Sequence, residues 1–228
     1  MPRERKLHDK YFKQAKEDGF AARSAYKLTE IQERHRLIRP GNWVIDLGCA
    51  PGSWCQVAGI IAGRTHRGLD SRVLGIDLQA VTAPMPENVR TVVGDVFALT
   101  AEDVCKLLGG LADVVLSDMA PNTTGDPGGD HFRSVALCRR VLELLPQILK
   151  PDGHLAMKVF EGEDYMKLLG ETAELFQEAK GLKPRATREV SREMFIIGEG
   201  YLGPIIKEEE TKRDPRLAPK RPPAKPGW

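Results

Sequence analysis

The central part of the chain alternates short apolar runs, rich in β-branched residues, with longer stretches of helical periodicity. This alternation is typical of βα units, which build a parallel sheet covered by helices. The apolar runs predict strands at 43–47, 72–77, 89–93, 112–118 and 154–160. The other stretches predict helices at roughly 54–63, 100–109, 132–149 and 164–180. Two more runs, near 183–188 and 194–198, predict a hairpin that closes the sheet of this α/β fold.

Composition fits one folded domain with short appendages. The chain has 228 residues, of which 41% are hydrophobic and 29% charged, close to the averages of globular proteins. No apolar run reaches the roughly 18 residues of a membrane span, and residues 1–6 lack the apolar core of a signal peptide. We therefore expect a cytoplasmic protein that makes no contact with membranes. No oligomerisation signal stands out, so we expect a monomer.

The cysteines and histidines favour neither a disulfide framework nor a metal site. The four cysteines form no C-x-x-C pair, and three of them lie in apolar stretches, as is usual for reduced thiols in a core. The five histidines show no spacing typical of metal ligands. We therefore expect no bound metal. The four cysteines are Cys49, Cys55, Cys105 and Cys138.

The net charge of +2 hides an uneven distribution along the chain. Residues 1–39 carry 11 Lys and Arg against 6 Asp and Glu, and residues 207–228 carry 7 against 4. Residues 40–206 carry 16 against 22. Basic ends around an acidic body fit a polyanionic partner, although such runs can also be solvated surfaces. The segment 207–228 also contains five prolines and predicts a flexible tail.

The loop after the first predicted strand has features of a nucleoside site. It reads Asp-Leu-Gly-Cys-Ala-Pro-Gly-Ser-Trp over residues 46–54. Glycine permits close approach of the backbone to a ligand, which a Cβ would block. The glycines Gly48 and Gly52 are spaced G-x-x-x-G, which differs from the G-x-G-x-x-G that seats a pyrophosphate. The spacing therefore disfavours a dinucleotide and a nicotinamide-dependent oxidoreductase.

Acidic residues stand at the ends of four successive predicted strands. An acid after the second strand is placed to accept hydrogen bonds from ribose hydroxyls, and one after the third is placed to reach an adenine amino group. An acidic cleft also attracts a positively charged sulfonium, so the pattern favours S-adenosylmethionine. Each acid alone is equally well explained as a turn or capping residue. The four are Asp46, Asp77, Asp95 and Asp118.

A lysine interrupts the fifth predicted strand. Lys158 lies among apolar residues, and a buried lysine is costly unless it is paired or loses its proton. Such an amine can act as a general base when carboxylates orient it. Its candidate neighbours are Asp118, Glu193 and Lys27. The alternative is a lysine at the strand end that extends to solvent.

These residues carry a resemblance to the FtsJ/RrmJ family of S-adenosylmethionine-dependent RNA ribose 2′-O-methyltransferases. The matching motifs are Asp46-Leu-Gly-x-x-Pro-Gly-x-Trp54, Ser117-Asp-Met-Ala-Pro-Asn122, Lys158-Val-Phe-x-Gly162 and Ser191-Arg-Glu193, with Lys27 upstream. The resemblance runs from about Lys10 to Gly198. It implies a Rossmann-like class I methyltransferase fold, with a seven-stranded, mostly parallel sheet and helices on both faces.

The resemblance also implies roles for individual residues. It implies a tetrad of Lys27, Asp118, Lys158 and Glu193, in which Lys158 accepts the proton. The cofactor contacts that it implies are Gly52, Trp54, Asp77, Asp95 and Asp118, with Asp46 and Gly48 shaping the loop. One departure is Phe195, at a position where an aromatic hydroxyl is common in the family; we expect a change in packing without loss of activity.

The implied reaction is methylation of the ribose 2′-hydroxyl of a uridine in large-subunit (23S) rRNA, either as free RNA or in the large ribosomal subunit. Residues 1–39 are then an RNA-facing segment and residues 40–206 the methyltransferase domain. The expected RNA-facing side chains are Lys10, Tyr11, Phe12, Lys13, Lys16, Phe20 and Arg23. Two alternatives stay open: a 2′-O-methyltransferase of tRNA or another RNA, and a ribosome-assembly factor without catalysis.

Overall fold

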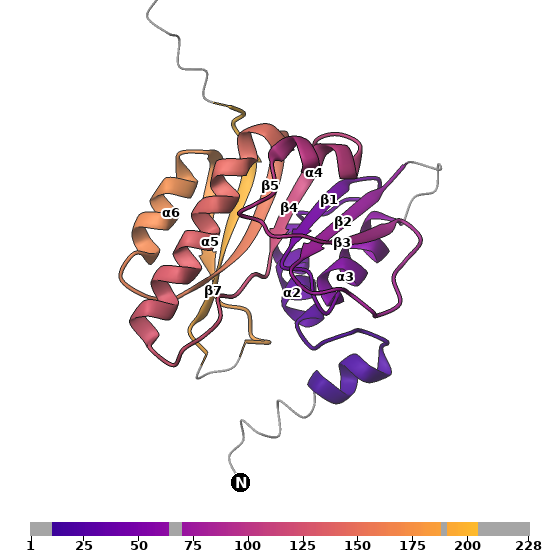
Figure 1. Ribbon diagram of the computed structural model, residues 1–228, viewed down its shortest axis with the longest axis horizontal. Helices are drawn as coiled ribbons and strands as arrows, with labels where there is room; N and C mark the ends of the chain where they lie inside the picture. Colours follow the sequence, from indigo (N-terminus) through magenta and orange to yellow (C-terminus); the bar gives the residue numbers. More distant parts are fainter. Residues whose placement is uncertain (1–10, 64–69, 188–190, 205–228) are drawn as a thin grey trace, which may run out of the picture.

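A seven-stranded sheet forms the centre of the molecule (Figure 1). The computed structural model describes residues 11–63, 70–187 and 191–204. The strand order is β3-β2-β1-β4-β5-β7-β6; the first five strands in this order are parallel, and β7 is antiparallel to both of its neighbours. The strands are β1 (Trp43–Leu47), β2 (Arg72–Asp77), β3 (Val89–Val93), β4 (Ala112–Ser117), β5 (Leu149–Phe160), β6 (Phe176–Leu182) and β7 (Glu193–Tyr201).

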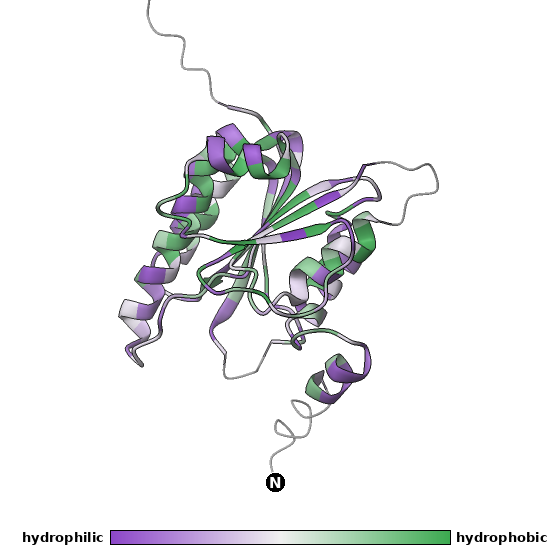
Figure 2. Cartoon of the chain, turned by 45° about the vertical axis from the view of Figure 1, so that its right-hand side comes forward, coloured by the Kyte–Doolittle hydropathy of each residue, from purple (hydrophilic) through white to green (hydrophobic). Residues whose placement is uncertain are grey.

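Helices cover both faces of the sheet. Two packed apolar clusters fill the two spaces between sheet and helices. Figure 2 shows that apolar residues run along the strands, whereas the helices also carry hydrophilic residues. On one face lie α2 (Ala25–His35) and α3 (Ser53–Ala62), and on the other lie α4 (Ala101–Leu108), α5 (Pro127–Ile148) and α6 (Tyr165–Ala173). Residues 11–17 form a further helical segment outside the sheet layers.

The predicted α/β fold with a mostly parallel, seven-stranded sheet is therefore confirmed. The bounds of β1, β2 and β3 match the sequence-based ranges, because each strand is a short apolar run ended by a loop. None of the described helices combines the length and the apolar character needed to span a bilayer. The four cysteines are free thiols, and only Cys105 is partly exposed.

Two helix boundaries differ from the sequence prediction. Helix α5 begins at Pro127, before the predicted residue 132, because the Asp126 side chain accepts hydrogen bonds from the backbone N–H groups of Gly128 and Gly129. Such a cap, followed by proline in the first turn, starts a helix despite the two glycines. Helix α6 ends at Ala173, well short of the predicted residue 180.

The strand predicted at 183–188 is wrong. The structure places β6 earlier, and the described residues 183–187 form a loop. The predicted helix 164–180 covers the first five residues of β6, because Glu, Ala and Lys are good helix formers. Pairing with β7 overrides that propensity, and Phe176 is buried with its ring centroid 5.5 Å from that of Tyr201. Strand β5 also begins at Leu149, before the predicted residue 154.

Candidate active site

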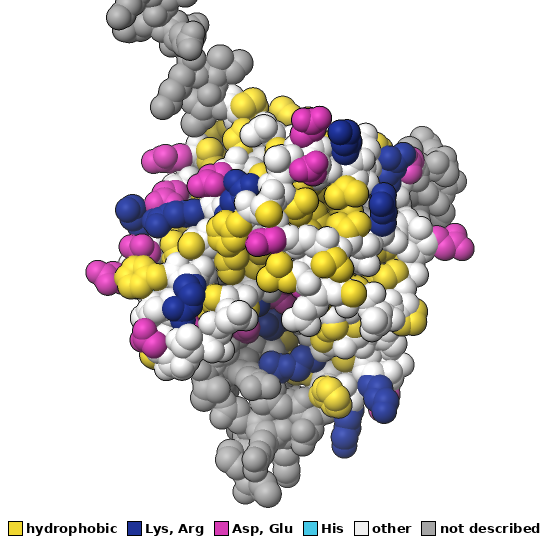
Figure 3. All heavy atoms as spheres, viewed as in Figure 1, with side chains coloured by type: hydrophobic (Ala, Val, Ile, Leu, Met, Phe, Trp, Pro, Cys, Tyr) yellow, Lys and Arg dark blue, Asp and Glu magenta, His cyan; other side chains and the backbone are white. Residues whose placement is uncertain are grey.

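A cavity opens at the edge of the sheet where the parallel strands end. Its volume is about 950 Å³. Figure 3 shows the molecule hollowed near the centre of the view, where acidic and basic side chains meet. The walls come from loops that follow β1, β2, β3 and β4, because the carboxyl ends of parallel strands share one edge. The lining includes Gly48, Ala50, Pro51, Asp77, Leu78, Asp95, Phe97, Asp118, Met119 and Lys158.

The backbone holds the predicted acids of the second and third strands in place. Asp77 accepts hydrogen bonds from the N–H of Ala50, at 2.9 Å, and from the N–H of Gln79, at 2.8 Å. Asp95 accepts a hydrogen bond of 2.9 Å from the N–H of Phe97. Each carboxylate keeps lone pairs for a ligand, because a carboxylate offers about four acceptor positions. The cavity therefore presents fixed acceptors on two neighbouring loops.

Gly48 also lines the cavity, and its backbone explains the residue type. Its φ is +76°, and a Cβ would lie 2.5 Å from Met119 Cγ and 2.8 Å from Met119 Cα. A side chain at this position would therefore push the loop after β1 away from the loop after β4. Glycine allows these two loops to pack closely at the floor of the cavity.

Three of the predicted cofactor residues lie behind the cavity wall. Asp46, Gly52 and Trp54 are absent from the lining. Asp46 is fully buried, and its Oδ2 accepts a hydrogen bond of 3.2 Å from Cys55 Sγ. Burial, reinforced by the charges of Asp118 and Asp77, raises the pKa of Asp46 to about 7.

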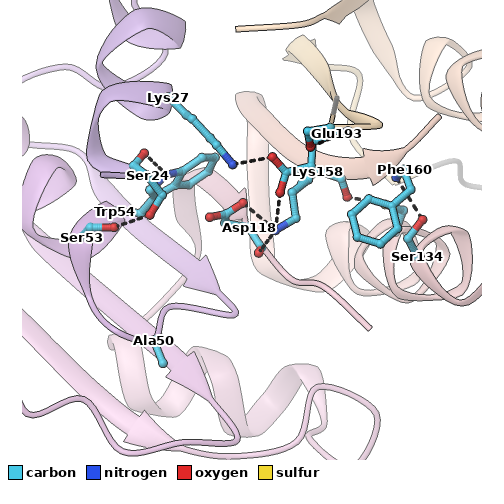
Figure 4. Close-up of polar contacts among 12 residues, drawn as sticks. Ser24, Lys27, Ala50, Ser53, Trp54, Asp118, Ser134, Lys158, Phe160 and Glu193 are labelled. Atoms are coloured by element: carbon cyan, nitrogen blue, oxygen red, sulfur yellow. Dashed lines mark hydrogen bonds and ion pairs between the residues drawn. The ribbon is translucent and has the colours of Figure 1, made fainter. Parts of the chain in front are cut away.

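The four residues of the predicted tetrad lie together (Figure 4), and two of them, Asp118 and Lys158, line the cavity. Lys158 Nζ lies 2.9 Å from Asp118 Oδ1 and 4.0 Å from Glu193 Oε1, and it donates a hydrogen bond of 2.6 Å to the backbone oxygen of Asp118. Lys27 Nζ lies 2.7 Å from Glu193 Oε2. Both lysine side chains are 6% exposed, so Lys158 does not extend to solvent. The charges alternate along the row Lys27, Glu193, Lys158 and Asp118.

Four different parts of the fold supply this row. Lys27 comes from α2, Asp118 from the end of β4, and Lys158 from β5. Glu193 is the first residue of β7, and the antiparallel direction of that strand places its start opposite Phe160 at the end of β5. The tetrad therefore depends on the one strand that reverses direction.

The charges of the two lysines control the ionisation of Glu193. Burial acts to raise the pKa of this carboxyl group, but Lys27, through its charge and hydrogen bond, and the charge of Lys158 outweigh the effect of burial. The pKa of Glu193 consequently lies below its ordinary value. A carboxylate that stays ionised stabilises a neighbouring ammonium. The arrangement can hold an amine at the cavity wall and stabilise the positive charge that the amine gains on accepting a proton.

Two exposed apolar side chains line the cavity, although the sequence analysis does not assign them to the site. Leu78 is 70% exposed and Phe97 is 56% exposed, and both line the cavity. Each follows a strand-end acid, Asp77 or Asp95, by one or two residues. A large apolar residue beside such an acid is the signal that would have identified them, because an exposed apolar surface at a cavity is typical of a ligand wall.

The aromatic residue that departs from the family pattern lies in the core. Phe195 is fully buried, and its ring is stacked on Trp54 with the centroids 5.6 Å apart. A hydroxyl group on this ring would need a partner in that environment. The expected change in packing without loss of activity stays a prediction.

The predicted RNA-facing segment is exposed only in part: Tyr11, Phe20 and Arg23 are partly buried, and α2 packs Leu28 and Ile31 into the core. Lys13 and Lys16 are exposed on the helical segment 11–17, and Phe12 is 66% exposed. Lys10 lies outside the described residues, as does the tail from residue 205. The contact of this segment with RNA stays a prediction.

Comparisons with known proteins agree with this geometry. The family model FtsJ-like methyltransferase matches residues 20–201. A Ribosomal RNA large subunit methyltransferase E from Desulfatibacillum aliphaticivorans is 42% identical over 190 residues, which are 83% of this chain and 89% of the relative. The protein of the same name from Azoarcus sp. (strain BH72) is 44% identical over 194 residues, 84% of this chain and 91% of the relative.

A solved structure supports the same assignment. It is described as a ribosomal RNA methyltransferase from Plasmodium falciparum and is 27% identical in sequence, with a TM-score of 0.69 over 81% of this chain and 100% of that chain. The family match covers both the cavity loops and all four residues of the tetrad. The chain is a methyltransferase and belongs to the FtsJ-like methyltransferase family.

Proposed function

We propose that the protein transfers a methyl group from S-adenosylmethionine to the ribose 2′-hydroxyl of a uridine in large-subunit (23S) rRNA. The observation that carries the proposal is the buried Lys158 amine, which lies at the cavity wall between the carboxylates of Asp118 and Glu193. The names of the relatives, which are large-subunit rRNA methyltransferases, support the choice of RNA.

The residues of the cavity fit S-adenosylmethionine. A volume of about 950 Å³ accommodates a nucleoside with an amino-acid arm. Asp77 would hold the ribose hydroxyls, Asp95 the adenine amino group, and the apolar side chains of Leu78 and Phe97 would cover the adenine ring. When bound, S-adenosylmethionine supplies a methyl group activated by a positively charged sulfonium, and the acidic side chains of the cavity favour that charge.

Five further residues act on this ligand, either directly or through the loops. Gly48 lets the loop after β1 pack against the neighbouring loop. Asp46, Gly52 and Trp54 set the shape of the loop and of the helix start behind the wall. Asp118 belongs to both the cavity and the tetrad, so it joins the cofactor site to the proton acceptor.

The residues of the tetrad divide the work of the reaction. Lys158, as the neutral amine, accepts the proton of the 2′-hydroxyl group as the methyl group is transferred and so becomes an ammonium. Asp118 and Glu193 stabilise the ammonium that results, and Lys27 holds Glu193 by their ion pair of 2.7 Å. Most of the fall in the barrier comes from alignment of the hydroxyl group, since positioning contributes about 7 to 11 kcal/mol.

In this proposal, the basic ends of the chain bind the RNA. Residues 1–39 form the RNA-facing segment, residues 40–206 the methyltransferase domain, and residues 207–228 a Pro-rich tail. The exposed Lys13 and Lys16 would neutralise phosphates. The enzyme works as a monomer in the cytoplasm, on free rRNA or on the large subunit.

The test is transfer of labelled methyl groups to large ribosomal subunits, free rRNA and tRNA in parallel, followed by mapping of the labelled nucleotide. We expect label on a uridine ribose of large-subunit rRNA. Lys158→Ala should reduce the single-turnover rate by about 10² to 10⁴, the usual effect of losing a general base, while the affinity for S-adenosylmethionine persists. Lys180→Ala, at an exposed lysine of β6, is the control and should keep the rate.

Other results would replace parts of the proposal. Label confined to tRNA would keep the reaction and change the substrate. Binding of the cofactor without label on any RNA would favour the assembly factor. A normal rate in Lys158→Ala would rule out this residue as the proton acceptor.

A further inference from the structure

Trp54 lies where a direct contact between its ring and a ligand is excluded. Its side chain is 2% exposed, is absent from the cavity lining and lies between α2 and β7. A tryptophan so deeply buried at the start of α3 serves the site through its neighbours, and those neighbours lead to the tetrad.

The indole N–H of Trp54 reaches the beginning of α2. It donates a hydrogen bond of 2.8 Å to the backbone oxygen of Ser24. The same oxygen accepts a hydrogen bond of 3.0 Å from the backbone N–H of Lys27. One carbonyl group thus joins the Trp54 side chain to the backbone of a tetrad residue (Figure 4).

The hydroxyl group of Ser24 makes a second connection between the same two helices. A serine at the N-cap position usually accepts a hydrogen bond from its own helix. The Ser24 side chain makes no such bond, and its Oγ lies 2.7 Å from Oγ of Ser53, the first residue of α3. Ser24 also lines the cavity. The start of α2, the helix that carries Lys27, is therefore fixed to the end of the loop between β1 and α3.

The ring of Trp54 makes a third connection, to β7. It is stacked on Phe195, with the planes 27° apart. Phe195 pairs with Lys158 in the register of β7 and β5, and its ring centroid lies 5.9 Å from Lys27 Nζ. Trp54 therefore contacts the start of α2, which carries Lys27, and strand β7, which carries Glu193.

We propose that Trp54 is a positioning residue for methyl transfer, which acts by holding Ser24 and Phe195 so that Lys27 and Glu193 keep their places around Lys158. The inference rests on the proposed function. Trp54 then connects the loop between β1 and α3 and the start of α2 to the tetrad. A shift of Trp54 would therefore displace the Lys27 ammonium from Glu193.

Trp54→Phe tests the proposal because it removes the indole N–H and keeps an aromatic ring. We expect the single-turnover rate at saturating cofactor to fall about 10- to 100-fold, as misplacement of catalytic groups by about an ångström does, with the affinity for S-adenosylmethionine within about twofold. The matched control is Trp43→Phe, since the Trp43 indole also donates to a backbone oxygen, that of Asp70, at 2.7 Å. Trp43 lies at the opposite end of β1, so the control should keep the rate.

A double-mutant cycle separates positioning from general destabilisation. If Trp54 acts through Lys27, then Trp54→Phe should lower the rate by less than about threefold in a Lys27→Met background, because coupled residues are not additive. The same fold-loss in both backgrounds would overturn the proposal. So would a loss of cofactor affinity with an unchanged rate at saturation.

A crystal structure of Trp54→Phe tests the proposal without RNA. We expect the separation of 2.7 Å between Lys27 Nζ and Glu193 Oε2 to lengthen, and an unchanged ion pair would overturn the inference. If the wild-type protein methylates no RNA, the proposed function fails, and this measurement still decides the role of Trp54.

Discussion

Asp46 illustrates how a single buried carboxyl group links the site to stability. Its Oδ1 is buried without a hydrogen-bond partner, and its Oδ2 accepts a hydrogen bond from the thiol of Cys55. Desolvation disfavours the carboxylate form. The native protein therefore retains a proton on Asp46 at pH values where the unfolded chain has lost it.

This proton makes stability depend on pH. Between the ordinary value of 3.8 and about 7, Asp46 binds more protons in the native state than in the unfolded state, so its contribution to the free energy of unfolding falls as pH rises and levels off above pH 7. Three pKa units correspond to about 4 kcal/mol. In Asp46→Asn this contribution should vanish. Urea unfolding of both proteins at pH 4 to 8 measures the difference, and Asp70→Asn, at an exposed side chain, should leave the slope unchanged.

For individual residues, the sequence predicts which charged groups belong to the site, but it does not predict how the neighbouring side chains pack. Lys158 and the strand-end acids stand out because a charge within or after an apolar strand is conspicuous. Trp54 also belongs to a recognisable motif, but a motif does not show where a side chain points. Its burial between Ser24 and Phe195 arises from contacts distant in sequence, which no local pattern reports.

Among the elements, β6 depends most on tertiary packing. It lies at the edge of the sheet and pairs only with β7. Phe176 is 2% exposed and packs over Gly198, where a Cβ would lie 2.8 Å from the phenyl ring. The small residue on β7 thus makes room for the large one on β6.

Phe176→Ala should therefore lower the free energy of unfolding by about 3 to 5 kcal/mol, the usual cost of emptying a phenylalanine site in a core. The expected mechanism is a cavity against Tyr201. Chemical denaturation checks the value. Glu178→Ala, at an exposed position of the same strand, should change it by less than about 0.5 kcal/mol.

The sequence predicts the parallel strands and β7 but misplaces the edge strand β6, because only buried strands are marked by apolar runs. Parallel strands are buried on both faces and read as apolar runs, as in Val44–Leu47. Strand β6 has one buried phenylalanine among exposed residues, and its composition favours a helix. Only the partner strand β7, which runs along its whole length, decides its conformation.

Over the whole molecule, charge is separated between the acidic body and the basic ends. RNA binding that relies on Lys13 and Lys16 should weaken with salt, because each neutralised phosphate releases counterions. Replacing both lysines with glutamine should reduce the slope of log K against log salt by about 1.5 to 2. Filter binding over a salt series measures the slope. The pair Lys106→Gln and Lys180→Gln, exposed elsewhere on the surface, should leave it unaltered; an equal change in both pairs would contradict the assignment.

The place of β7 as the last described strand of the chain also sets the order in which the residues of the site are synthesised. The residues that line the cavity run from Ala21 to Lys158, so the ribosome has made all of them before it reaches Glu193. Glu193 then arrives at the right edge of the sheet only because β7 runs against its neighbours. All residues of the cavity wall are therefore synthesised before the fourth member of the tetrad, and the tetrad is complete only after β7 has been made.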